Sequence, residues 1–185
     1  MNPTDRRVIA VFGSSATSPG SAEYTDGVTC GRLLGEAGFA VATGGYFGTM
    51  EAVSRGAAEA GAPVIGVTAP SVFPGRAGAN QWVSHEIPAE DLVRRIALLS
   101  DLADGFIALP GSIGTLAELL VAWNLAFVAP FAEVDFGPIA TVGDTWRELV
   151  PQLTDHLNTN SDAVVTCVSV TDAVRHVIGA LGQPL

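Results

Sequence analysis

The sequence predicts an α/β fold, a Rossmann-like three-layer αβα sandwich around a mostly parallel sheet. Short, continuously apolar runs alternate with longer helical patterns, which is typical of a parallel sheet covered by helices on both faces. Apolar residues make up 48% of the 185-residue chain and charged residues only 15%, so a disordered chain is excluded. A chain of this length fits a single nucleotide-binding domain over residues 1–185.

Six short runs rich in strand-forming residues predict the strands of this sheet. They are Val8–Phe12, Phe39–Thr43, Pro63–Val67, Gly105–Leu109, Gly137–Val142 and Ala163–Val168. The segments between and after them predict helices at Ser21–Ala37, Met50–Ala60, Ala89–Leu102, Thr115–Phe127, Thr145–Leu157 and Thr171–Leu181. Glycine, proline and alanine over Pro70–Asn80 predict a long mobile loop.

Composition excludes several classes of function. The formal net charge of −10 repels polynucleotide backbones, so no nucleic-acid partner is expected. All nine basic residues are arginine, and without a lysine the chain cannot form a Schiff base with pyridoxal phosphate or supply the lysine of a P-loop. The spacing of the histidines and cysteines is not that of a metal site, and Cys30 and Cys167 are typical of buried, reduced thiols. We expect no cofactor and no metal.

The distribution of apolar residues predicts a cytoplasmic location. Glycine, proline or a charged residue interrupts every candidate run before the length of about 18 residues that a bilayer span requires. The segment before Val8 is too short for a signal peptide and lacks a small-residue cleavage site. No membrane contact is therefore expected.

Three glycine-containing loops follow the strands that end at Phe12, Thr43 and Leu109, and each opens a helix. In open parallel sheets, ligands bind beyond the carboxyl ends of the strands. Glycine lets backbone N–H groups approach an anion, and a helix N-terminus adds partial positive charge, so such loops suit a phosphate. One loop alone would be read as a tight turn, but three at one edge favour a phosphate site. The candidate phosphate-binding residues are Gly13, Ser14, Ser15, Gly44, Gly45, Gly48, Thr49, Gly111, Ser112, Gly114 and Thr115.

Two charged residues are placed for chemistry rather than solubility. Arg95 lies in a mostly apolar helical run, and Glu118 follows the third glycine loop. Adjacent helical positions point about 100° apart, so at most one of Arg94 and Arg95 faces a pocket. For Glu118 an alternative stays open, because Thr115 three positions earlier completes a capping box that would stabilise the helix start without catalysis.

The stretch Ser100–Glu118 resembles the Lonely Guy family of cytokinin riboside 5′-monophosphate phosphoribohydrolases, which carries Pro-Gly-Gly-x-Gly-Thr-x-x-Glu at this point. The resemblance extends through Phe12–Ser15, Gly44–Met50 and Val64–Val67, and so covers most of the chain as far as about Phe127. Members of the family are often labelled "possible lysine decarboxylase", which the missing lysine contradicts for any pyridoxal-phosphate mechanism.

This resemblance implies hydrolysis of the bond between base and ribose in an AMP-like nucleoside 5′-monophosphate, of the cytokinin-activating type. The family's paired arginine and glutamate map to Arg95 and Glu118. Glu118 would stabilise the oxocarbenium ion or position water, and Arg95 would hold the carboxylate, phosphate or ribose and keep the carboxylate ionised. The resemblance also implies a homodimer with the Arg95 helix at the interface near the site.

The second and third glycine loops depart from the family pattern. Gly-Gly-Tyr-Phe-Gly-Thr-Met-Glu stands where the family has Gly-Gly-Gly-x-x-Gly-Leu-Met-Gly, and Ser112 replaces a glycine. Tyr46 is expected to narrow the pocket or stack on a ligand ring. Similar changes occur in a branch that resembles molybdenum-cofactor carrier proteins. The second hypothesis is therefore a non-catalytic binding or carrier protein for a nucleotide or the molybdenum cofactor, a pterin phosphate.

Overall fold

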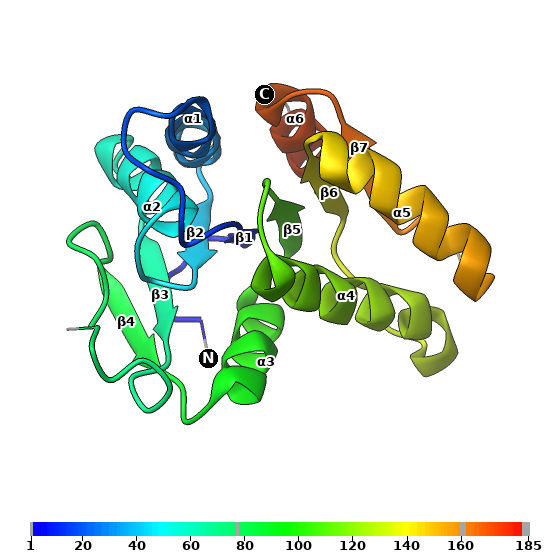
Figure 1. Ribbon diagram of the computed structural model, residues 1–185, viewed down its shortest axis with the longest axis horizontal. Helices are drawn as coiled ribbons and strands as arrows, with labels where there is room; N and C mark the ends of the chain where they lie inside the picture. Colours follow the sequence, from blue (N-terminus) through cyan, green and yellow to red (C-terminus); the bar gives the residue numbers. More distant parts are fainter. Residues whose placement is uncertain (1, 77, 160–161, 183–185) are drawn as a thin grey trace.

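The computed structural model describes residues 2–76, 78–159 and 162–182, which leaves Ala77 of the expected loop outside the described residues. Within this part of the chain, seven strands form one sheet in the order β4-β3-β2-β1-β5-β6-β7, and every neighbouring pair is parallel (Figure 1). The predicted α/β three-layer fold is confirmed. The strands are β1 (Val8–Phe12), β2 (Ala40–Thr43), β3 (Val64–Thr68), β4 (His85–Pro88), β5 (Gly105–Ala108), β6 (Ile139–Val142) and β7 (Val164–Cys167).

Helices cover both faces of the sheet because successive strand residues point to opposite sides. On one face, Ile9 and Val41 pack against α1, α2 and α6; on the other, Ala10 and Phe106 pack against α3, α4 and α5. In Figure 1, α1 and α6 lie at the top of the view and α3 and α4 lie below. The helices are α1 (Ala22–Glu36), α2 (Thr49–Glu59), α3 (Leu92–Leu102), α4 (Ile113–Val128), α5 (Asp144–Leu157) and α6 (Val170–Ala180), with a short 3-10 helix, η1 (Ala129–Ala132).

Two helix starts that position the site are fixed by their caps. The Ser21 side chain accepts a hydrogen bond from the backbone N–H of Tyr24, and the Asp91 side chain accepts one from that of Arg94. The expected helix over Ala89–Leu102 therefore begins later, at Leu92. Close packing of α1 on α2 depends on glycine, because a Cβ at Gly31 would lie 2.0 Å from the carbonyl oxygen of Val53.

Among the described strands, β4 is the one that the sequence did not predict. His85–Pro88 pairs with β3 at the edge of the sheet, and three of its four residues are exposed. An edge strand with a solvated face has no continuous apolar run, and proline is tolerated there because its nitrogen needs no ladder partner.

One apolar stretch is longer than expected from the sequence. Ile113–Ala132, which joins α4 and η1, is 20 residues long and apolar enough to cross a bilayer by length and composition. The expectation that no run reaches that length was wrong because its single charged residue, Glu118, does not offset the apolar remainder. Only 28% of its apolar window is buried, with Leu119 and Ala122 among the buried residues, and a single helix of this length and composition is weak evidence for a membrane span.

The sheet order places the three glycine loops side by side. β1 lies between β2 and β5: the chain first builds β2, β3 and β4 on one side of β1 and then returns to build β5, β6 and β7 on the other side. Because β1, β2 and β5 are parallel neighbours, the loops that follow them meet at the carboxyl ends of these strands. This is the topological switch point at which open parallel sheets bind their ligands.

Candidate functional site

Arg95 of α3 is buried at this edge and held by the backbone. Its Nε donates to the carbonyl oxygen of Val67 at 2.8 Å, and its Nη2 donates to that of Gly44 at 2.9 Å. Both carbonyls lie at the carboxyl ends of their strands, so the guanidinium lies beneath the second glycine loop. Arg94 is exposed, which confirms that only one of the two adjacent arginines faces inward.

Glu118 of α4 lies next to Arg95. Its Oε1 is 3.5 Å from Nη1 of Arg95, and each residue is only 8% exposed. The capping-box alternative is wrong, because α4 begins at Ile113 with Ser112 in the cap position, which places Thr115 and Glu118 inside the helix. The Glu118 carboxylate therefore lines the cavity and does not cap the start of α4.

Burial dominates the protonation of Glu118. It raises the pKa of the carboxyl from 4.5 to about 7, and Arg95 only partly opposes this rise. The expectation that Arg95 keeps this carboxyl ionised is therefore corrected: the loss of water outweighs one guanidinium at 3.5 Å. Burial also lowers the pKa of Arg95, and the positive charge of Arg76 lowers it further.

This raised pKa predicts a pH-dependent stability. A carboxyl whose pKa is higher in the folded state stabilises the fold below its unfolded pKa and loses that contribution as pH rises through the folded value. We expect the free energy of unfolding of the wild type, relative to Glu118→Gln, to fall by up to ~3 kcal/mol as pH rises from about 5 to about 8. Urea denaturation at both pH values measures it. Parallel pH trends in the two proteins would contradict the shift.

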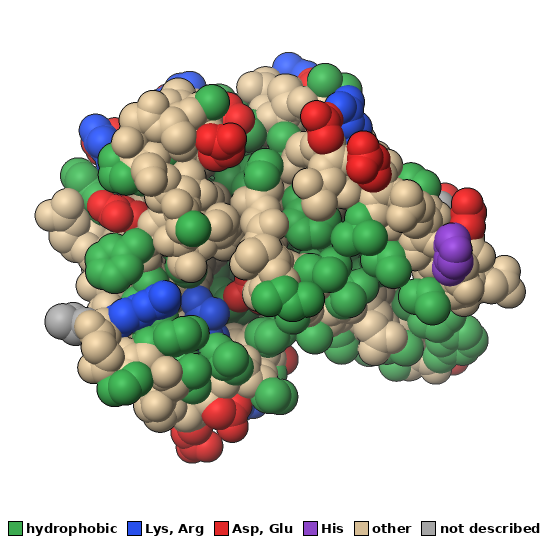
Figure 2. All heavy atoms as spheres, in the orientation of Figure 1, with side chains coloured by type: hydrophobic (Ala, Val, Ile, Leu, Met, Phe, Trp, Pro, Cys, Tyr) green, Lys and Arg blue, Asp and Glu red, His purple; other side chains and the backbone are tan. Residues whose placement is uncertain are grey.

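A cavity of about 190 Å³ opens above this pair. In Figure 2, two basic side chains and an acidic one lie together in a hollow on the visible face. The hollow is lined by Val11, Phe12, Gly13, Ser15, Gly44, Met50, Phe73, Arg76, Leu92, Arg95, Ser112, Gly114, Thr115 and Glu118. Elements β1, α2, α3, α4 and the loop after β3 thus contribute side chains or backbone to one cavity.

Not every predicted phosphate-binding residue reaches this cavity. Six of them line it, and a second hollow of about 450 Å³ shares Ser112 with it and is lined by Ser14 and Gly111. The remaining three shape the loops instead. Gly45 and Gly48 adopt φ angles of +75° and +70°, which favour glycine, and Thr49 is buried with its hydroxyl 2.8 Å from that of Thr17.

Tyr46 has a different role from the one expected. It is 1% exposed, and its hydroxyl accepts a hydrogen bond from the backbone N–H of Ala69 at 2.8 Å. Its ring contacts the guanidinium groups of Arg76 and Arg95 and packs edge-on against Phe73. A ring so enclosed supports the loop after β3 and is not available to stack on a ligand.

Sequence reasoning missed Phe73 and Arg76, which the loop after β3 brings into the cavity. Loop composition predicts neither the conformation nor the contacts of such a segment. One signal was present in the sequence: Arg76 has no acidic residue within four positions on either side, unlike the arginines of the exposed helix faces. Among the described residues, no cluster of three or more His, Cys, Asp or Glu side chains forms a metal site.

The chain matches the model of the family described as "Possible lysine decarboxylase" over residues 50–181. A rice relative (Oryza sativa subsp. japonica) named cytokinin riboside 5′-monophosphate phosphoribohydrolase is 36% identical over 120 residues, 63% of this chain and 49% of its own length. A relative of the same name from Mycobacterium tuberculosis is 33% identical over 124 residues, 63% of this chain and 62% of its own. The chain thus spans about half to three fifths of these relatives.

Solved structures match the fold along nearly the whole chain. The molybdenum cofactor binding protein of Rippkaea orientalis has a TM-score of 0.75 at 20% identity, over 95% of this chain and 98% of that one. The Moco carrier protein of Chlamydomonas reinhardtii has a TM-score of 0.70 at 22% identity, over 97% and 100%. At these identities the likeness establishes the fold alone.

Proposed function

The chain belongs to the family described as "Possible lysine decarboxylase", and we propose that within this family it is a nucleoside 5′-monophosphate phosphoribohydrolase. One nucleotide and one water are converted to free base and ribose 5-phosphate. The names of the curated relatives support the cytokinin-activating type as its specificity. Decarboxylation through pyridoxal phosphate does not fit these residues, because the chain has no lysine to form the Schiff base.

The observation that carries the proposal is the buried carboxylate of Glu118 in a cavity formed by glycine loops. Cleavage of an N-glycosidic bond develops positive charge on the ribose, and a desolvated carboxylate stabilises that charge more strongly than one in water. The ionised form is the active one in this role. It also orients the water that attacks the anomeric carbon.

Arg95 acts on the reaction through Glu118. Two of its nitrogens donate to backbone carbonyls, and a third lies beside the carboxylate, so its position is fixed before a ligand binds. Its positive charge lowers the pKa of Glu118 and so partly offsets the rise that burial causes, which increases the ionised fraction near neutral pH. Arg95 is therefore a positioning residue of this site.

The experiment that tests this function is the release of free base from a panel of nucleoside 5′-monophosphates, including prenylated adenines. Turnover of one member supports the hydrolase and identifies the base. Binding without turnover of any member would instead support the carrier hypothesis. The observation that favours this hypothesis is the altered second glycine loop, in which Tyr46 replaces a glycine and packs in the cavity wall. Mass spectrometry of the protein as isolated then identifies the carried ligand.

We further propose a homodimer located in the cytoplasm, with its interface on α4 in place of the expected interface at the Arg95 helix. The outer side of α4 exposes Leu120, Val121 and Phe127, beside a groove of about 290 Å³ between α4 and α5 that lies away from Arg95. Figure 2 shows hydrophobic side chains gathered over this region. Contiguous apolar surface of this kind favours association with a second copy. The buried, free thiols of Cys30 and Cys167 suit a reducing compartment, and cell fractionation tests the location.

A charge on α4 is expected to dissociate this dimer. Phe127→Asp would bury a carboxylate in the interface, so light scattering should show the monomer mass for the variant and the dimer mass for the wild type. Val168→Asp is the control, because Val168 is 80% exposed at the far end of β7 and should leave the mass unchanged. A wild type that is monomeric at all concentrations would refute the proposed dimer.

A further inference from the structure

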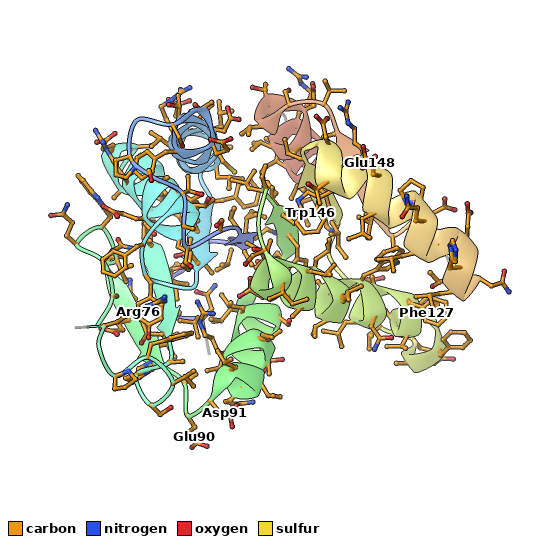
Figure 3. The ribbon with its side chains drawn as sticks, in the orientation of Figure 1. Arg76, Glu90, Asp91, Phe127, Trp146 and Glu148 are labelled. Atoms are coloured by element: carbon orange, nitrogen blue, oxygen red, sulfur yellow. The ribbon has the colours of Figure 1, made fainter. Side chains whose placement is uncertain are left out.

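Arg76 projects into the cavity from the loop between β3 and β4, where it is labelled in Figure 3. Its guanidinium carbon lies 4.2 Å from the ring centre of Phe73 and 4.6 Å from that of Tyr46. The loop itself is tied down next to it, because the Asn80 side chain donates to the carbonyl oxygens of Gly45 and Tyr46. Two aromatic rings and an anchored loop therefore hold this guanidinium in place without neutralising it.

The charge of Arg76 is unpaired within the part of the chain that the structure describes. Four arginines on exposed helix faces pair with a carboxylate three or four residues away: Arg32 with Glu36, Arg55 with Glu59, Arg147 with Asp144 and Arg175 with Asp172. The Arg76 side chain makes no ion pair or hydrogen bond with the described residues, and its recorded contacts are those with the two rings. In a chain with a net charge of −10, an unpaired guanidinium lining a cavity is an unused anion-binding group.

Arg95 cannot take this role, because its donors are already engaged by Val67, Gly44 and Glu118. Arg76 and Arg95 both lie within 6 Å of the centre of the Tyr46 ring, and like charges this close repel each other. Two guanidiniums against one carboxylate leave the cavity with excess positive charge. An anionic ligand group would remove that excess and satisfy the free donors of Arg76.

We propose that Arg76 binds the phosphate group of the ligand and makes the site selective for phosphorylated over unphosphorylated nucleosides. This inference rests on the proposed function. It identifies Arg76 as the positive charge that balances the phosphate, which the uncharged glycine loops cannot supply. Tyr46 and Phe73 lie against the guanidinium, so its in-plane N–H donors remain for the ligand. Such donors match two oxygens of a phosphate in a bidentate arrangement.

The test compares ligand affinities in a protein that cannot turn the ligand over. Calorimetric titrations in a Glu118→Gln background measure binding of AMP, ribose 5-phosphate and adenosine, with and without Arg76→Gln. We expect Arg76→Gln to weaken AMP and ribose 5-phosphate by about tenfold to a hundredfold and to leave adenosine unchanged. Arg76→Lys should retain part of the phosphate affinity, because the charge remains while the planar donors are lost.

Arg94→Gln is the matched control, since it removes the same charge from an exposed side chain outside the cavity lining and should leave all three affinities unchanged. Equal losses for AMP and adenosine in Arg76→Gln would place Arg76 at the base or ribose and overturn the inference. Unchanged AMP affinity, or a parent protein that binds AMP no better than adenosine, would overturn it as well. These titrations require binding and not turnover, so they decide the role of Arg76 even if no nucleotide proves to be hydrolysed.

Discussion

Replacing Glu118 with glutamine should lower kcat for nucleotide hydrolysis by about 10³-fold while leaving nucleotide affinity nearly unchanged. Glutamine has the shape of the carboxylic acid but never carries its negative charge, so it cannot stabilise the developing charge on the ribose. The buried carboxyl of the wild type has a pKa of about 7, and kcat/KM should therefore rise with pH through that region. Steady-state assays over pH, together with calorimetric binding, measure both quantities.

Glu148→Gln is the control for this substitution. Glu148 is exposed on α5, away from the cavity, as Figure 3 shows, so the same chemical change there should leave kcat and its pH profile unaltered. A Glu118→Gln protein with wild-type kcat would remove the carboxylate from the mechanism.

A single methyl group at Gly44 should strongly reduce kcat although Arg95 and Glu118 are both left unsubstituted. A Cβ at this position would lie 1.6 Å from Nη2 of Arg95, so in Gly44→Ala the guanidinium must move from its place beside Glu118. Displacement of a positioned group by about 1 Å costs on the order of 10²-fold in rate. The clash is with the end of a flexible side chain, so we expect Gly44→Ala to fold, with a loss in kcat much greater than its loss in stability.

Gly179→Ala serves as the comparison, because nothing lies within 4 Å of the added Cβ and the site in α6 is remote from the cavity. Assays of kcat paired with thermal unfolding separate the two effects. If Gly44→Ala retained wild-type kcat, the position of Arg95 beside Glu118 would have no importance for the reaction.

Buried strands were easier to predict than exposed ones. β1 was predicted with its observed bounds because Val8–Phe12 is apolar throughout, as a central parallel strand must be. β4 was missed because an edge strand need not be apolar, and His85–Pro88 is not. Helix starts shifted by up to three residues where a polar cap, such as Asp91 before α3, decides the first turn.

Residues on regular elements were also easier to place in the site than residues on loops. Arg95 and Glu118 lie on α3 and α4, which pack against the sheet. The resemblance to a known family predicted that the two side chains act as a pair, and in the structure they lie next to each other. The protonation of Glu118 depends on how completely both residues are buried, which sequence does not provide. The position of the Arg76 guanidinium in the cavity depends on the path of the loop after β3 and on contacts with Phe73 and Tyr46, and no local sequence pattern predicts either.

The most direct test of the central claim is product analysis of nucleoside 5′-monophosphate turnover by chromatography and mass spectrometry. Hydrolysis of the N-glycosidic bond predicts free base and ribose 5-phosphate in equal amounts, appearing with the wild type and lost with Glu118→Gln. Inorganic phosphate with intact nucleoside, or nucleotide that is bound but recovered unchanged, would contradict the assignment of this cavity to base release.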